Sequence, residues 1–261
     1  MRAAVHAATR LTVDTSAAGQ RVRWAHAWPV VLRQTGPQRV HLVHAAGGPL
    51  GGDELALSVD IGAGAVLAMH SAGATLVQPG AGEAAGVPAR WAVTVRVGAG
   101  ARLDWAPQPT VVSDGAALES SLRVELGAGA GATVREVVVL GRHGQRGGRD
   151  TGALEIVVDG VPLLVHTTVL DGADPGLCGP AGTAGARAVG TLVCAGAATG
   201  KAVGAGESGD VRWAWMALDG PGAVLLAVGT PSAVTAVLDA AVDTTPVVSR
   251  PPSAPAAMGM V

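Results

Sequence analysis

The residues around two carboxylates in this sequence suggest a chemical or structural role for them. The first, Glu136, lies within residues 133–142, where valines occupy both faces of an expected strand. A carboxylate buried there must be paired, hydrogen-bonded or protonated, because an isolated buried charge is costly. Glu136 either forms a salt bridge with an arginine or contacts a ligand or a proton in transfer. The sequence leaves both possibilities open.

The second carboxylate, Asp53, closes a loop of small residues, Gly47-Gly48-Pro49-Leu50-Gly51-Gly52-Asp53. Taken alone, this pattern predicts a turn in which Asp53 accepts backbone hydrogen bonds. The same loop could border a channel for a cation, because small side chains leave room beside the carboxylate.

The histidines and cysteines show no spacing typical of a metal site. Only His41 and His44 are close in sequence, and a separation of three places them on opposite faces of a strand. Cys178 and Cys194 form neither a CxxC pair nor a disulfide framework. We interpret them as two reduced thiols in a cytoplasmic protein.

No motif of a known catalytic class is complete. HExxH, paired CxxC and GxSxG patterns are absent. Residues 196–202 resemble a phosphate-binding loop, but one residue is missing between the glycines and Ala202 stands where Ser or Thr must hold magnesium. Nucleotide binding is therefore not expected there.

The composition excludes several other classes of protein. The 261 residues are 49% hydrophobic and 15% charged, which is incompatible with a disordered chain. A net charge of −2, without a basic cluster, argues against a nucleic-acid binder. The sequence shows no export signal, and Pro221 and Pro231 interrupt its longest uncharged run near the end, so we expect no membrane span.

The elements that must position these residues are mainly strands. Apolar and polar residues alternate in residues 55–61, 91–97 and 122–126. Each run is followed by the same Gly-Ala-Gly-Ala sequence and then by a second apolar segment, which predicts a strand–turn–strand hairpin. The offsets between these units, 36 and 29 residues, indicate stacked repeats that are too irregular for a strict solenoid, and they disfavour a hexapeptide-type β-helix.

The last third of the chain adds a hairpin and a helix. Asp159-Gly160 between two apolar runs predicts a tight hairpin. Thr230-Pro231 predicts a helix start, with Val234 and Leu238 on one face. We therefore expect a mostly-β fold of stacked or repeated hairpins in layered sheets, with a β-helix-like topology and one or two C-terminal helices. It forms one domain over residues 1–246, and a proline-rich flexible tail covers residues 247–261.

The order of the motifs resembles the UreD (UreH) family of urease accessory proteins. Six blocks occur in the family's order: the loop at residues 47–53, Ser71-Ala72-Gly73-Ala74-Thr75, Trp105-Ala106-Pro107-Gln108-Pro109-Thr110, Glu136 through Leu140-Gly141-Arg142, Leu163-Leu164-Val165 and Gly190-Thr191-Leu192-Val193-Cys194. The chain departs from the family pattern at Leu76, at Gly148 and at His166, which replaces an acidic residue.

The resemblance implies a non-enzymatic scaffold for urease maturation. Such proteins bind the urease apoprotein and the accessory proteins UreF and UreG, a GTPase, and together they insert nickel into the urease active site. No tightly bound cofactor is implied, only nickel in transit. The motif positions Gly47, Gly48, Gly51, Gly52, Gly141 and Arg142 are candidate binding positions whose role is open.

A protein that passes nickel on must hold it weakly, because every 1.4 kcal/mol of affinity slows release about tenfold. Glu136, Asp53 and His166 are therefore our candidate transient nickel contacts. The alternative is a β-fold metal-dependent enzyme that uses the same three residues. High apolar content and low charge density favour the partner-dependent scaffold.

Overall fold

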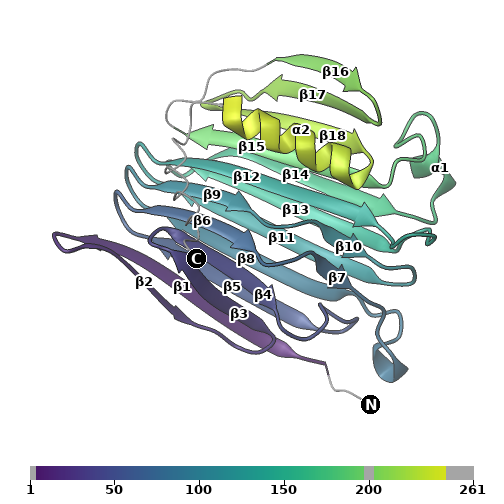
Figure 1. Ribbon diagram of the computed structural model, residues 1–261, viewed down its shortest axis with the longest axis horizontal. Coiled ribbons are helices and arrows are strands. Elements are labelled where there is room, and N and C mark those ends of the chain that lie inside the picture. Colours follow the sequence, from purple (N-terminus) through teal and green to yellow (C-terminus); the bar gives the residue numbers. More distant parts are fainter. Residues whose placement is uncertain (1–3, 197–202, 245–261) are drawn as a thin grey trace, which may run out of the picture.

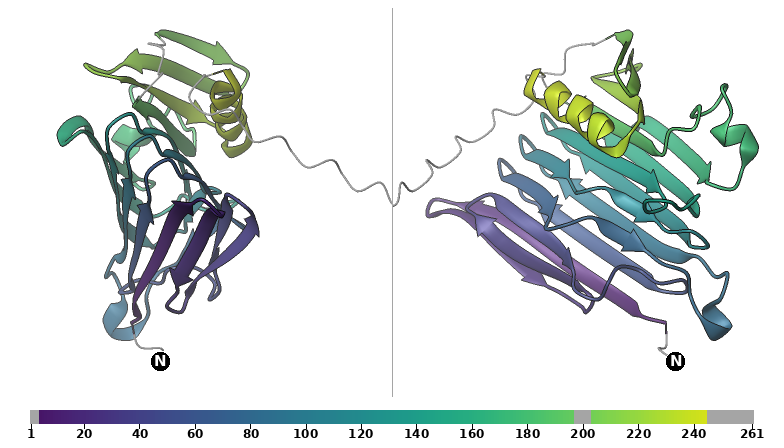
Figure 2. Two further views of the ribbon diagram at one scale, coloured as in Figure 1. Left: turned by 90° about the vertical axis from the view of Figure 1, so that its left-hand side faces the viewer. Right: turned by 45° about the vertical axis from the view of Figure 1, so that its right-hand side comes forward.

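The computed structural model describes residues 4–196 and 203–244, and these form two β-sheets stacked face to face (Figures 1 and 2). Sheet A contains, in spatial order, β14 (Val161–Asp171), β13 (Arg149–Val158), β11 (Ala117–Leu126), β8 (Ala89–Val97), β5 (Glu54–Ile61), β1 (His6–Ser16) and β2 (Gly19–Ala25). Sheet B contains β16 (Gly204–Ser208), β17 (Val211–Ala217), β18 (Gly222–Gly229), β15 (Ala188–Gly196), β12 (Gly131–Leu140), β9 (Arg102–Ala106), β6 (Val66–Ser71), β4 (Arg39–His44) and β3 (Val30–Gly36). The short strands β7 (Thr75–Val77) and β10 (Thr110–Val112) extend sheet B beside β12.

The expected mostly-β, β-helix-like fold is confirmed, but the expected hairpins at the Gly-Ala-Gly-Ala sequences are wrong. Strand β5 belongs to sheet A and β6 belongs to sheet B, so the turn between them is a corner that crosses from one sheet to the other. The strands of each sheet then pair in parallel with the equivalent strand of the next coil, as β5 does with β8 and β8 with β11. Stacked coils of this kind resemble a β-solenoid, which the irregular offsets had argued against. The coils differ in length because the loops between their strands differ in length.

The corners stack because glycine permits their backbone. Gly64, Gly100 and Gly129 have φ of 68°, 65° and 66°, a region that side chains disfavour. The amide of Gly64 donates to the carbonyl of Ala99 in the next corner, at 2.9 Å. At Gly98, a Cβ would lie 2.8 Å from the backbone nitrogen of Ala63, so the corners can stack this closely only without a side chain.

The expected Asp159-Gly160 hairpin is confirmed. Strands β13 and β14 pair antiparallel, and Val158 faces Val161 across a turn in which both central residues have positive φ. This hairpin forms the edge of sheet A.

The expected C-terminal helix is also confirmed, as α2 (Pro231–Thr244). It packs on the outer face of sheet B and buries Val234 and Leu238 against β15 and β18 (Figures 1 and 2). Gly190 allows the contact, because a Cβ there would lie 2.5 Å from the side chain of Val234. The other helical elements in the described residues are η1 (Gly82–Ala84) and α1 (Pro175–Cys178).

The main apolar core fills the space between the two sheets. The inward side chains of each strand come from alternate residues, such as Leu57 and Val59 of β5 and Leu67 and Met69 of β6. In the described residues, no helix is long and apolar enough to cross a membrane. The tail at residues 247–261 and most of residues 196–202 lie outside the described residues.

The stacked corners generate a testable prediction. We expect Gly98→Ala to lower the free energy of unfolding by about 1–3 kcal/mol, because its Cβ meets rigid backbone of the preceding corner. Gly73→Ala is the matched control, since a Cβ at Gly73 meets no atom within 4 Å. Urea unfolding of both variants measures the difference. Equal stability of the two would show that the corners do not need the close approach.

Candidate functional site

A half-open cavity of about 50 Å³, lined by polar and apolar residues, lies between the two sheets. Eleven residues line it: Ser120, Glu136, Val138, Asp150, Gly152, Leu154, His166, Thr168, Leu170, Val189 and Thr191. They come from β11, β13 and β14 of sheet A and from β12 and β15 of sheet B. A space of this size holds a few water molecules where polar groups are available to bind them.

Glu136 faces this cavity from β12. The alternation along β12 points Val134, Glu136 and Val138 inward and Arg135 and Val137 outward, toward α2. Burial and, as the smaller cause, the nearby carboxylate of Asp150 together raise the pKa of Glu136 to about 7. The raised pKa favours the protonated form of Glu136 at a pH where an exposed glutamate is ionised.

The salt bridge considered for Glu136 is not found among the described residues. Its neighbour Arg135 is buried on the outer face, where its guanidinium pairs with Asp239 of α2 and donates to the carbonyl of Pro107 at 3.2 Å. Arg135 therefore joins the helix to the sheet, and within residues 4–196 and 203–244 no arginine or lysine forms an ion pair with Glu136.

Asp150 is a functional candidate that sequence reasoning missed. It enters the cavity from β13, is 1% exposed, and one carboxylate oxygen has no hydrogen-bond partner. Burial raises its pKa to about 7. The signal was present in the sequence, because Asp150 alternates with Leu154 and Ile156 on the inward face of the strand.

His166, a candidate contact from the sequence, lies across the cavity on β14. Its Nε2 is 2.8 Å from the hydroxyl of Thr168, which also lines the cavity. The structure thus brings Glu136 and His166 together and adds Asp150 to them.

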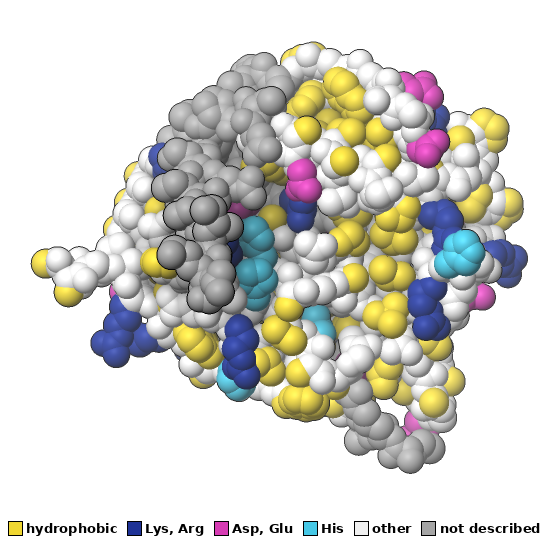
Figure 3. All heavy atoms as spheres, viewed as in Figure 1, with side chains coloured by type: hydrophobic (Ala, Val, Ile, Leu, Met, Phe, Trp, Pro, Cys, Tyr) yellow, Lys and Arg dark blue, Asp and Glu magenta, His cyan; other side chains and the backbone are white. Residues whose placement is uncertain are grey.

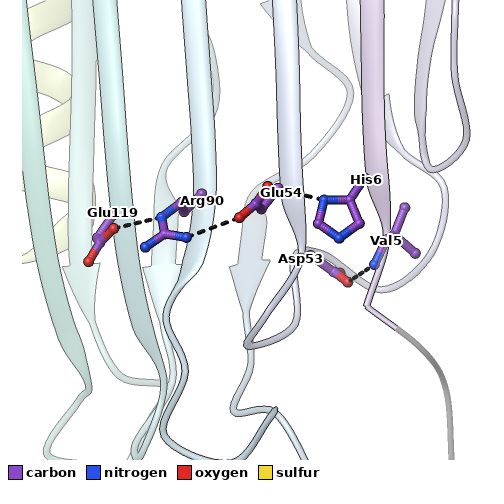
Figure 4. Close-up of polar contacts among 6 residues, drawn as sticks. All are labelled: Val5, His6, Asp53, Glu54, Arg90 and Glu119. Atoms are coloured by element: carbon purple, nitrogen blue, oxygen red, sulfur yellow. Dashed lines mark hydrogen bonds and ion pairs between the residues drawn. The ribbon is translucent and has the colours of Figure 1, made fainter.

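Asp53 is not part of this cluster. It is buried just before β5, where one carboxylate oxygen accepts from the amide of Val5 at 2.8 Å (Figure 4). The other oxygen accepts from the amide of Leu50 at 3.0 Å. These contacts match the turn interpretation, because the carboxylate joins its loop to the beginning of β1.

The glycines of the same loop are required by close packing. Gly48 has φ of 93°, and a Cβ there would lie 1.7 Å from the carbonyl oxygen of Leu76. A Cβ at Gly51 would lie 2.6 Å from the backbone of Gly80. Gly47 and Gly52 also have positive φ. The loop therefore packs backbone against backbone.

The second group of motif positions follows β12. Gly141 has φ of 71°, and the carbonyl of Arg142 accepts from the guanidinium of Arg187 at 2.5 Å. The same guanidinium donates to the carbonyl of Leu140 at 2.7 Å. At Gly148, a Cβ would lie 2.1 Å from the carbonyl of Ala116, so this departure from the family pattern sits in tightly packed backbone.

The outer face of sheet A carries a row of ion pairs near the start of its strands. His6, Glu54, Arg90 and Glu119 occupy matching positions on four neighbouring strands (Figure 4). Arg90 contacts Glu54 at 3.0 Å and Glu119 at 2.9 Å, and His6 contacts Glu54 at 3.1 Å. Exposed pairs of this kind contribute little stability and mark a solvated face.

The cavity can exchange protons and offer oxygen and imidazole ligands to a cation. Across the described parts of the chain, no three His, Cys, Asp or Glu side chains already surround one metal position. The metal-dependent enzyme considered from the sequence needs Asp53, Glu136 and His166 together, and the structure separates Asp53 from the other two.

Comparison with known proteins identifies the same family as the motifs. A family model described as UreD urease accessory protein matches residues 5–255. The urease accessory protein UreD of Parafrankia sp. is 37% identical over 245 residues, covering 85% of this chain and 81% of that protein. UreD of Frankia alni is 37% identical over 226 residues, covering 72% and 75%, and UreD of Streptomyces coelicolor is 41% identical over 170 residues, covering 63% and 66%.

The raised pKa values of the cavity carboxyls predict a pH-dependent stability. Between about pH 4 and pH 7 the folded chain holds protons on Glu136 and Asp150 that the unfolded chain has released. Stability therefore falls as pH rises through this window and then levels off, by an amount on the order of a few kcal/mol.

The double variant Glu136→Gln, Asp150→Asn removes this dependence. We expect it to unfold at higher urea concentration than the wild type at pH 8 and at a similar concentration at pH 4. Urea midpoints measured across this range make the comparison, and parallel pH profiles would contradict the raised pKa values.

Proposed function

The chain belongs to the UreD family of urease accessory proteins, and we propose that it is a cytoplasmic, non-enzymatic scaffold for GTP-dependent nickel insertion into urease. Family membership gives a role in urease maturation. The further proposal is that this chain binds the urease apoprotein together with UreF and UreG, and that nickel passes through it without being retained.

Exposed apolar side chains support a protein that works in a complex. Val161, Val165 and Val169 are 67%, 72% and 52% exposed on β14, an edge strand of sheet A. Trp28 is 61% exposed in the loop before β3. Long apolar edge strands and exposed tryptophans are features that partner proteins cover.

The cavity between the sheets carries the proposal for nickel. Glu136, Asp150 and His166 line one polar space inside an apolar core, and this observation supports a transient cation site. Retaining two carboxyls there destabilises the folded chain, as their raised pKa values indicate. A role in cation transfer accounts for keeping them.

Weak binding follows from the same chemistry. A carboxyl with a pKa of about 7 must release its proton before it can ligate Ni²⁺, so protonation competes with the metal at neutral pH. We propose that this competition keeps nickel exchangeable. We assign Asp53 a structural role, because its oxygens accept the amides of Val5 and Leu50.

Deletion of the protein tests the function as a whole. We expect urease made without it to be folded but depleted of nickel, because the missing step is metal insertion. The measurement is the nickel content of urease purified from deletion and complemented strains. Fully loaded urease in the deletion strain would exclude a role in nickel insertion.

Substitution at the cavity tests the transfer path. We expect Glu136→Gln to lower the nickel content of urease at least about tenfold while leaving complex formation unchanged, because the variant removes a ligand and keeps the shape of the side chain. Asp53→Asn is the control. It weakens the loop and should lower the yield of complex and the nickel content in proportion. Measuring both quantities in each preparation separates a path residue from a folding residue, and proportional losses in Glu136→Gln would contradict the path.

A further inference from the structure

A second group of metal-ligating side chains lies on the outer face of sheet B, away from the cavity. His41 on β4 and His70 on β6 are in register on neighbouring parallel strands, and their ring centroids are 5.6 Å apart. Asp104 on β9, the next strand, has a carboxylate oxygen 3.4 Å from Nε2 of His70. Figure 3 views the molecule from the side of α2, and histidine side chains are visible on that surface.

The alternation of the strands separates this group from the core. The inward residues are Val40 and Leu42 on β4 and Met69 on β6, so the histidines between them point outward. The side chains of His70 and Asp104 are 30% and 28% exposed, which leaves them accessible from solvent.

The contact between His70 and Asp104 is incomplete as a hydrogen bond. Nε2 of His70 is buried as an atom and has no hydrogen-bond partner, although the carboxylate oxygen lies 3.4 Å away. Two ligand atoms that each lie about 2.1 Å from a tetrahedral metal are separated by about 3.4 Å. The spacing therefore suits a cation between the two atoms better than a direct hydrogen bond.

His41 can supply a further ligand. Its Nδ1 is 2.7 Å from the hydroxyl of Thr35, and this contact leaves Nε2 as the free nitrogen. A hydrogen bond to the other ring nitrogen is the usual support for a metal-ligating histidine. In the described residues, no three His, Cys, Asp or Glu side chains already surround one metal position. The side chain of His41 must therefore rotate toward His70 and Asp104 to complete the site.

We propose that His70, Asp104 and His41 form a half-buried binding site for a late first-row divalent cation such as Ni²⁺ or Zn²⁺. Two imidazoles and one carboxylate select these ions over Mg²⁺ and Ca²⁺, which prefer sites made of oxygen ligands. Arg39 lies near His41, and its positive charge opposes a cation there. Binding therefore depends on the imidazole nitrogens and the carboxylate of Asp104, not on a negative surface. The site does not depend on the proposed path through the cavity.

Titration of the full-length chain with NiCl₂ or ZnSO₄ in a calorimeter tests this site. The background is the Glu136→Gln, Asp150→Asn variant, which removes the cavity carboxyls. We expect one binding event that His70→Ala weakens at least about tenfold and that His41→Ala weakens less, while MgCl₂ and CaCl₂ give no such event.

His6→Ala is the matched control, because His6 also contacts a carboxylate, on the other sheet and without a second imidazole in contact. Circular dichroism of each variant verifies folding. If His70→Ala is folded and binds Ni²⁺ and Zn²⁺ as its parent does, or if His6→Ala causes the same loss, the site does not exist. A misfolded His70→Ala is replaced by Asp104→Asn, with the same two outcomes.

Discussion

The in-register stacking of parallel strands is the constraint on which the rest of this structure depends. Because β5, β8 and β11 pair residue against residue, every position is fixed to the inside or the outside of the stack along with its equivalents in the neighbouring coils. An inward-facing polar side chain therefore lies between the inward-facing apolar side chains of the neighbouring strands. The cavity around Glu136 and Asp150 exists because β12 and β13 each break the inward row with a carboxylate.

Alternation along single strands could be predicted from the sequence, and with it the burial of Glu136 and the common face of Leu164 and His166. The pairing of strands could not. Glycine at positive φ serves a hairpin and a corner equally well, and an alternating strand does not indicate which strand lies beside it. The hairpin interpretation followed from that ambiguity.

The candidate site shows the same limit. Asp53 and Glu136 were both candidate nickel contacts, but the first is held by backbone amides and the second faces a carboxyl on another sheet. Only the tertiary arrangement distinguishes them. Asp150 could have been found from its alternation with Leu154, yet its meeting with Glu136 required knowing that β12 and β13 face each other across the core.

The inside and the outside of sheet B also differ in charge, and this difference suits a cation path. Arg135 is turned outward to Asp239, and no arginine or lysine of the described residues lines the cavity. Further along the inward side, burial lowers the pKa of His44 to about 4, so its ring, 5.5 Å from that of Trp91, is neutral at pH 7. Fixed positive charge would raise the energy of a divalent ion in a low-dielectric interior, whereas neutral imidazole and titratable carboxyls do not. The strand alternation that keeps guanidinium groups outside therefore leaves the cavity lining without fixed positive charge, which the proposed nickel path requires.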